Sequence, residues 1–196
     1  MGCPPLLKVA HPSFVGKLRG IYALAIYDTR LRRLLLSRDR FGIKPLFYAP
    51  GRDRLAFASE IRALLELPDI ERRPDRQAMY DFTALFYMPA PETFYRGIRA
   101  LQPDEILGAQ LDLNGGSWKT RAFQRWAITP DSDTRLAQAV DRADTLITEG
   151  VHRRMESDVP LDALLSVGMN SSLISTAAQH AIGGIRTFNV HFPEKE

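Results

Sequence analysis

The sequence predicts a chain of mixed class, with an α+β region followed by an α/β region. Short apolar runs separated by turn residues fill residues 20–58, a pattern typical of antiparallel strands. After residue 134, a long amphipathic segment precedes a strand–helix–strand pattern, which is typical of a parallel sheet. The polar segment 129–133 lies between the two regions, so we expect one domain over residues 1–128 and a second over residues 129–196.

Four strands are expected at the start of the first region. Each is a short run of mainly apolar residues, and turn residues such as Asp28 and Gly51 separate the runs. The expected ranges are 21–27, 34–39, 45–49 and 55–58. Such closely spaced strands favour an antiparallel meander or one layer of a sandwich.

Two helices and a further pair of strands are expected next. Ser59 is a suitable N-cap for a helix over residues 60–67, which Pro68 ends. A helix over residues 75–87 carries apolar side chains at helical spacing, namely Met79, Phe82, Leu85 and Phe86. A strand over residues 106–113 precedes the sequence Asn-Gly-Gly, which predicts a hairpin turn before residues 117–126.

The second region is expected to contain a long helix and then two strands on either side of a shorter helix. The long helix covers residues 134–155, and the later elements cover 161–165, 171–180 and 187–192. An apolar stripe along the long helix comprises Leu136, Val140, Ala143, Ile147 and Val151. Two parallel strands with one helix rarely stand alone, so we expect this region to be the first part of a larger sheet.

Composition excludes several classes of protein. With 45% hydrophobic and 25% charged residues among 196, the chain has the composition of an ordinary globular protein. The formal net charge is only +3 and the basic residues are scattered, so no nucleic-acid partner is expected. No apolar run approaches the roughly 20 residues of a membrane span, so no membrane association is expected.

Cysteine and histidine usage points to neither a disulfide nor a metal centre. Cys3 is the only cysteine, so no internal disulfide can form, and a reducing cytoplasmic location is expected. The four histidines show no metal-ligand spacing; they are His11, His152, His180 and His191.

The consecutive charges at Arg38, Asp39 and Arg40 have two interpretations. They form either a catalytic charge cluster or structural ion pairs that fix a turn before Gly42. We favour the structural interpretation, because most charge runs of this kind stabilise local structure.

Residues 160–172 have the layout of a phosphate-binding loop. An apolar strand leads into a small-residue loop and then a hydroxyl-rich helix start, where backbone N–H groups and the helix dipole can hold a phosphate. A pyrophosphate loop of the SGGxDSS type has Gly where Val167 stands and Asp where Asn170 stands. The alternative is that the segment is only a connection between a strand and a helix.

Three sequence blocks give the chain a resemblance to the glutamine-dependent asparagine synthetases. The first block comprises residues 18–28, 37–48 and 58–61, the second comprises 89–98, and the third runs from 155 to 160 into the loop just described. In that family, an Ntn-hydrolase glutaminase domain releases ammonia from glutamine. A synthetase domain of the ATP-pyrophosphatase type, related to the adenine nucleotide α-hydrolases, activates aspartate with Mg-ATP and joins it to ammonia.

The resemblance implies roles for both expected domains. Residues 1–128 would be the C-terminal part of the glutaminase, and residues 129–196 the N-terminal part of the synthetase. The implied substrates are glutamine and aspartate, and the implied cofactors are ATP and Mg²⁺. The implied ATP-binding residues are Leu165, Ser166, Gly168, Asn170, Ser171, Ser172 and Val190.

Several positions depart from the family pattern. The family nucleophile is a cysteine at the mature N-terminus, whereas Cys3 follows Gly2, so no catalytic residue is assigned. No metal ligand is assigned either. Asp104 and Asp162 stand where the family usually has glycine.

Three functional interpretations remain open from the sequence. The chain is a fragment or degenerate synthetase that is inactive alone, a non-catalytic paralogue that acts as an interaction module, or an amidotransferase for another carboxylate. Because both expected domains look incomplete, a partner chain or a homodimer is expected.

Overall fold

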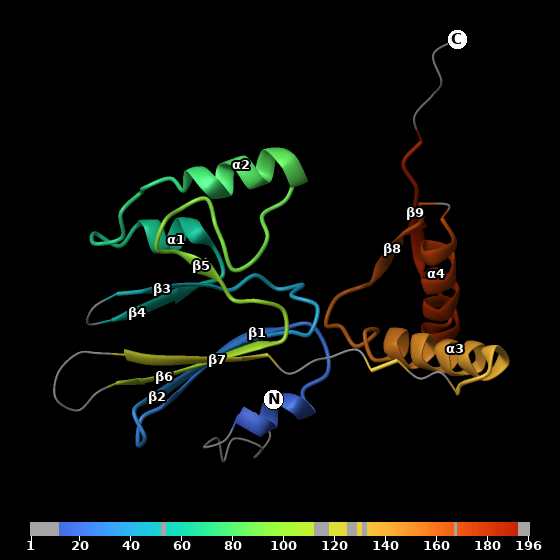
Figure 1. The fold of residues 1–196 in the computed structure, drawn as a ribbon. Coiled ribbons are helices and arrows are strands. Elements are labelled where there is room, and N and C mark those ends of the chain that lie inside the picture. Colours follow the sequence, from blue (N-terminus) through green and yellow to red (C-terminus); the bar gives the residue numbers. More distant parts are fainter. Residues whose placement is uncertain are drawn as a thin grey trace, which may run out of the picture. The chain divides into compact units, whose positions relative to one another are not determined.

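The computed structural model describes residues 12–51, 54–111, 118–124, 129–130, 133–166 and 168–191 (Figure 1). The chain divides into two compact units, Met1–Ile128 and Thr129–Glu196. The first unit contains antiparallel sheets with short helices, and the second contains two parallel strands with two helices. The chain is therefore of mixed α and β class, as the sequence predicts.

The larger sheet of the first unit is antiparallel throughout. Its strands are β1 (Ala23–Asp28), β2 (Arg33–Arg38), β6 (Glu105–Leu111) and β7 (Trp118–Gln124), in that spatial order. The turn between β1 and β2 is fixed by Asp28, whose Oδ1 accepts hydrogen bonds from the N–H groups of Arg30 and Leu31 at 2.9 and 3.0 Å. The strands predicted over 21–27, 34–39 and 106–113 are confirmed within a few residues. The predicted turn at 114–116 lies outside the described residues.

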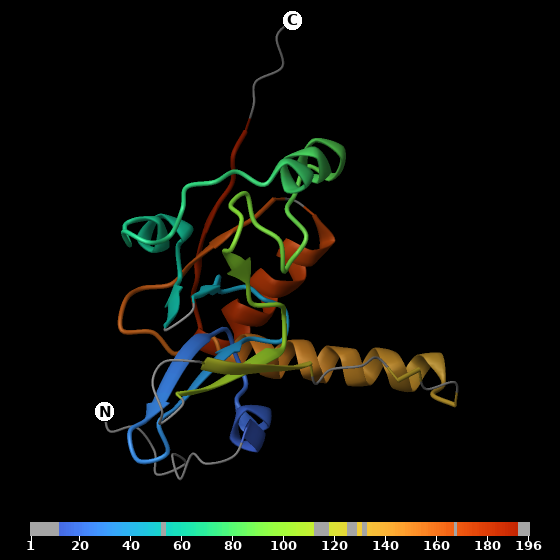
Figure 2. The same cartoon turned by 60° about the vertical axis from the view of Figure 1, so that its left-hand side comes forward.

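The smaller sheet consists of β4 (Leu55–Ala58), β3 (Phe47–Pro50) and β5 (Arg99–Ala100), in the order β4-β3-β5. Both of its expected strands are therefore confirmed. The two sheets lie one above the other (Figures 1 and 2).

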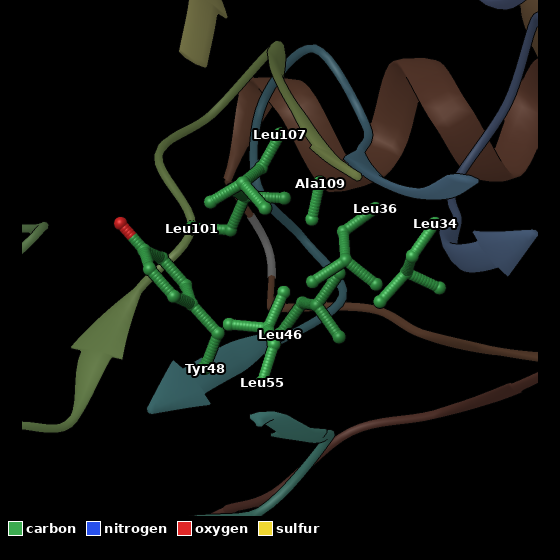
Figure 3. Packing of buried hydrophobic residues seen from close by; sticks show 8 residues of the cluster. All are labelled: Leu34, Leu36, Leu46, Tyr48, Leu55, Leu101, Leu107 and Ala109. Atoms are coloured by element: carbon green, nitrogen blue, oxygen red, sulfur yellow. The ribbon is translucent and has the colours of Figure 1, made fainter. Parts of the chain in front are cut away.

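A shared apolar core fills the space between these sheets (Figure 3). It is made of alternate residues of the facing strands, because successive side chains of a strand point to opposite faces. Its members are Leu34, Leu36, Leu46, Tyr48, Leu55, Leu101, Leu107 and Ala109. The four expected strands are divided between two sheets, so of the two arrangements considered from the sequence the sandwich layer is confirmed and the meander is wrong.

Helix α1 (Ile61–Leu65) packs on the smaller sheet, while the 3₁₀ segment η1 (Pro12–Lys17) precedes β1. Leu64 of α1 is 1% exposed and belongs to a second apolar cluster with Ala49 and Ile98. The expected N-cap role of Ser59 is wrong, because Glu60 is at the N-cap and makes no side-chain capping hydrogen bond. The burial of Leu64, rather than a cap, therefore holds this short helix.

Helix α2 (Arg76–Leu85) has a strong N-cap and few internal contacts. Asp75 accepts hydrogen bonds from the N–H groups of Gln77 and Ala78, and Phe86 ends the helix in a left-handed conformation. Ala78 is the only buried residue of the helix. The apolar residues expected to mark a packed face are therefore not buried, with Phe82 38% and Phe86 83% exposed.

The second unit contains α3 (Leu136–His152), β8 (Asp162–Leu164), α4 (Met169–Ile182) and β9 (Arg186–Phe188). Strands β8 and β9 are parallel, with Asp162 opposite Arg186 and Leu164 opposite Phe188. This order confirms the predicted strand–helix–strand pattern. The apolar stripe predicted on α3 is buried only at its C-terminal end, where Val151 is 5% exposed. Leu136, at the N-terminal end, is 80% exposed.

Two negative findings concern the described residues alone. None of their helices combines the length and apolar character needed to cross a membrane. None of their His, Cys, Asp and Glu side chains form a group of three or more that could hold a metal ion.

Candidate functional site

The loop over residues 165–172 begins at the carboxyl end of β8 and opens α4. The N–H of Leu165 donates to the carbonyl of Phe188 at 2.8 Å, so the first loop residue remains tied to β9. The side-chain amide of Asn189 donates to the carbonyl of Leu165, also at 2.8 Å. The loop thus lies outside the carboxyl ends of both parallel strands, where open α/β sheets usually bind ligands.

Hydrogen bonds of serine hydroxyls connect the two ends of this loop. Ser171 Oγ accepts a hydrogen bond from the N–H of Ser166 at 3.2 Å and donates to the carbonyl of Gly168 at 2.9 Å. The Oγ atoms of Ser166 and Ser171 are 3.1 Å apart, and Ser172 Oγ donates to Gly168 at 3.0 Å. The hydroxyls expected to contact phosphate are therefore engaged with the loop itself.

Gly168 is the N-cap of α4 and has φ −78° and ψ 154°. This extended conformation is open to any residue, and an added Cβ would meet only Ser166 Oγ at 3.5 Å and Ser171 Oγ at 4.0 Å. The fold itself therefore does not require glycine at this position. The helix start that Gly168 precedes has N–H groups without intrahelical partners, and such groups can bind an anion or water.

The structure brings most of the predicted ATP-binding residues together. Ser166, Gly168, Ser171 and Ser172 are joined by hydrogen bonds, and Leu165 precedes them directly. The remaining two, Asn170 in the first turn of α4 and Val190 just after β9, are both exposed, Val190 at 73%. Val167 lies outside the described residues.

Two open hollows lie beside this loop within the second unit. One, of about 280 Å³, is lined by residues that include Leu165, Ser172 and Thr187. The other, of about 390 Å³, includes Asn170, Ser171 and Asp162 in its lining. Each hollow is thus lined by residues of the predicted ATP-binding set together with strand residues outside that set.

Two features of this region were missed in the sequence. The side chain of Asn189 connects the end of β9 to the loop. A polar residue directly after an apolar strand was the sequence feature that could have predicted this contact. Asp162 and Arg186 form a bidentate ion pair at 2.8 and 3.0 Å between β8 and β9. Residues 24 apart in sequence give no local sign of such a pair.

The Asp39 loop, residues 38–44, is the second candidate from the sequence, and its structure is defined by backbone contacts. Arg38 donates to the carbonyls of Lys44, Leu101 and Gly42 at 2.7, 2.6 and 2.5 Å. Asp39 is 1% exposed and accepts hydrogen bonds from the N–H groups of Phe41, Ile43 and Lys44 at 3.0 to 3.1 Å.

These contacts support the structural interpretation of the charge run. Arg38 and Asp39 fix the turn at Gly42 by hydrogen bonds to backbone groups. Burial alone raises the pKa of Asp39, but hydrogen bonds from backbone groups, chiefly those of Lys44, Ile43 and Phe41, bring the pKa below its ordinary value. Burial lowers the pKa of Arg38, and the adjacent Asp39 charge opposes that shift.

Comparison with known proteins matches the two parts of the chain to two families. Residues 7–123 match the glutamine amidotransferase domain, and residues 142–196 match asparagine synthase. The Asp39 loop falls in the first match and the 165–172 loop in the second. These matches identify a glutamine amidotransferase domain followed by sequence of the asparagine synthase class.

Curated relatives align with nearly the whole of this chain, across both regions. Asparagine synthetase (glutamine-hydrolysing) 3 of Bacillus subtilis is 30% identical over 93% of this chain and 30% of its own length. A Mycobacterium tuberculosis protein provisionally named as a glutamine-hydrolysing asparagine synthetase is 33% identical over 90% of this chain and 28% of its own length. The chain belongs to the glutamine-hydrolysing asparagine synthetase family and spans less than a third of the length of these relatives.

Among solved structures, the glutamine phosphoribosylpyrophosphate amidotransferase of Bacillus subtilis is similar over 90% of this chain and 34% of its own chain. Its sequence identity is 18% and its TM-score is 0.35.

Proposed function

We propose that this chain forms the region where the glutaminase and synthetase parts of an asparagine-synthetase-type amidotransferase meet in sequence. Residues 1–128 are assigned to an Ntn-hydrolase-type glutaminase domain, and residues 129–196 to the start of an ATP-pyrophosphatase-type synthetase domain. The whole protein would take ammonia from glutamine and use ATP to amidate aspartate. No residue of the described part is assigned a catalytic role.

Gly168 carries the proposal that the 165–172 loop is the nucleotide loop of this domain. The fold tolerates a side chain at Gly168, so packing of the described residues does not account for the glycine. Close approach of a ligand phosphate to the helix start is the chemistry that a glycine at this place permits. Leu165 and Val190 are assigned to the neighbourhood of the adenine base.

The phosphate part of ATP fits this loop better than the Mg²⁺ ion does. Mg²⁺ prefers carboxylate oxygens together with phosphate oxygens, and the loop offers the neutral amide of Asn170 in place of a carboxylate. The Ser171 hydroxyl would also have to leave the N–H of Ser166 and the carbonyl of Gly168 to contact a phosphate. We therefore propose a degenerate nucleotide loop with no measurable affinity for Mg-ATP.

Isothermal titration calorimetry with Mg-ATP tests this proposal on three proteins. The unaltered chain is expected to give no binding heat. The variant that combines Val167→Gly with Asn170→Asp is expected to gain binding, and adding Gly168→Ala to it is expected to remove that gain while circular dichroism stays unchanged. Micromolar binding by the unaltered chain would overturn the proposal.

A second candidate function is amidation of a carboxylate other than aspartate. A Gibberella zeae protein named amidase chry2 is 26% identical over 87% of this chain, so the matched region also occurs in a relative with another name. The acceptor can be tested in the full-length protein by comparing pyrophosphate release with aspartate and with other amino-acid carboxylates. Aspartate-dependent release would favour the first candidate.

A further inference from the structure

Strands β8 and β9 stop pairing through their backbones at Leu165 and Asn189, where the proposed nucleotide loop begins. The register sets Leu164 opposite Phe188, and the N–H of Leu165 still donates to the carbonyl of Phe188 at 2.8 Å. In a regular parallel ladder, the next bond would run from the N–H of Val190 to the carbonyl of Leu165. Among the described residues this bond is not made, and the side-chain amide of Asn189 donates to the Leu165 carbonyl in its place, at 2.8 Å.

This exchange sets a backbone donor and a backbone acceptor at the ends of the two strands. The N–H of Val190 makes no hydrogen bond with another described residue, and Val190 is 73% exposed. The carbonyl of Leu165 is occupied by Asn189, whose side chain is itself exposed. The hollow of about 280 Å³ is lined in part by Leu165, so a ligand there can reach this strand end.

A donor and an acceptor on adjacent strand ends are complementary to an edge of adenine. Adenine presents its 6-amino group as a donor, with an acceptor ring nitrogen beside it. The carbonyl of Leu165 can accept from the amino group, and the N–H of Val190 can donate to the ring nitrogen. The amide NH₂ of Asn189 has the same donor chemistry as the amino group, so it occupies the acceptor that the base would use.

We propose that Asn189 is a specificity-determining residue at the base end of the nucleotide loop. Its carboxamide takes the place of the amino group of adenine at the Leu165 carbonyl, and adenine binds only after this side chain has turned away. The inference rests on the proposed function, since it takes the 165–172 loop as the nucleotide loop. It adds an obstacle to ATP that is separate from Asn170 and from the serine hydrogen bonds at the phosphate end.

The size of this obstacle follows from the contact that must be broken. Asn189 is exposed and gives up one neutral hydrogen bond, which contributes a factor of about three to ten to an equilibrium. Removing the side chain should therefore tighten the binding of an adenine nucleotide by about that factor. Hypoxanthine has an oxygen in place of the 6-amino group and cannot donate to Leu165, so its nucleotide should not benefit.

Calorimetry with Mg-ATP and with Mg-inosine triphosphate tests the inference. The titrations use the full chain carrying Val167→Gly and Asn170→Asp, with and without Asn189→Ala. Asn189→Ala is expected to lower the dissociation constant for ATP about three- to tenfold and to leave that for inosine triphosphate unchanged. Gln138→Ala is the matched control and should change neither, because it also removes an exposed carboxamide bonded to a backbone group, the N–H of Arg135, but lines neither hollow.

The measured quantity is the ratio of the two affinities, so a general loss of binding does not imitate the effect. Asn189→Leu replaces Asn189→Ala if circular dichroism shows that the alanine variant is unfolded; leucine is similar in size, has no donor and should also raise the ratio. An unchanged ratio would overturn this inference and leave the proposed function standing. If the chain with Val167→Gly and Asn170→Asp binds neither nucleotide, with or without Asn189, the proposed function is overturned and this inference falls with it.

Discussion

Replacing Asp39 by asparagine should destabilise the first unit by about 2–4 kcal/mol. The carboxylate is 1% exposed and accepts three backbone hydrogen bonds, two at Oδ1 from Phe41 and Ile43 and one at Oδ2 from Lys44. Asparagine has nearly the same shape but only one acceptor oxygen. It can keep the pair at Oδ1, and its NH₂ group then faces the N–H of Lys44, leaving a donor unpaired. Hydrogen bonds to a charged group contribute about 1.5–3 kcal/mol each, and an unsatisfied buried donor costs about 1–3 kcal/mol.

Amide hydrogen exchange followed by mass spectrometry or NMR measures this effect where it arises. We expect the amides of Phe41, Ile43 and Lys44 to lose about 30- to 1,000-fold of their protection in Asp39→Asn, since about 1.4 kcal/mol corresponds to a factor of ten. Asp28→Asn is the matched control, because Asp28 also accepts two backbone hydrogen bonds, but in an exposed turn. Equal losses of protection in the two variants would refute the argument from burial.

The same carboxylate predicts a dependence of stability on pH. The pKa of Asp39 is lower in the folded protein than its ordinary value of 3.8, so the charged form is favoured by folding. Its contribution is therefore fully present above the unfolded pKa and is lost as the pH falls through the lower folded pKa. A plot of unfolding free energy against pH should fall less steeply below about pH 4 in Asp39→Asn than in the unaltered chain. Parallel acid limbs would contradict the assignment.

Two further substitutions test the packing of the first unit, and a third in the second unit serves as a control. Gly42→Ala should cost more than about 1 kcal/mol, because Gly42 has φ +64° and an added Cβ would lie 2.9 Å from Pro103 Cγ; a thermal melt with unchanged midpoint would contradict this. Leu36→Ala should cost about 3–5 kcal/mol, because Leu36 is 0% exposed between the sheets. Leu136→Ala, at a position 80% exposed on α3, should change the unfolding free energy by less than about 0.5 kcal/mol in urea titrations. Similar costs at the two leucines would show that the core is misplaced.

The strands of the first unit were predictable because their signal is local. Alternation in β2 places Leu34 and Leu36 on one face, and turn residues such as Asp28 delimit the strand. The cap of α1 was wrong for a physical reason. A serine can cap a helix only if it directly precedes the first helical residue. The burial of Leu64 favours a helix that begins at Ile61, so the N-cap position falls on Glu60 and not on Ser59.

Exposure of the helical stripes was not predictable from the sequence. Helical spacing in α2 and α3 shows which residues share a face, but burial of that face requires a neighbouring surface. Phe86 and Leu136 sit on such faces and are 83% and 80% exposed. The role of Arg38 was missed for a similar reason, since one of its acceptors, the carbonyl of Leu101, is 63 residues away in sequence.

The two glycine-containing loops that carry the family resemblance are constrained by different forces. Gly42 is required by the fold, because its backbone is left-handed and a Cβ would meet both Pro103 and Arg38 within about 3 Å. Gly168 has an extended backbone and would meet nothing closer than 3.5 Å. Similarity at the Asp39 loop therefore reports how the unit folds, whereas packing of the described residues does not account for the glycine at 168. It follows that Gly168→Ala alone should leave the melting temperature unchanged. A loss of stability there as large as that in Gly42→Ala would assign Gly168 to the fold and remove the main support for a nucleotide loop.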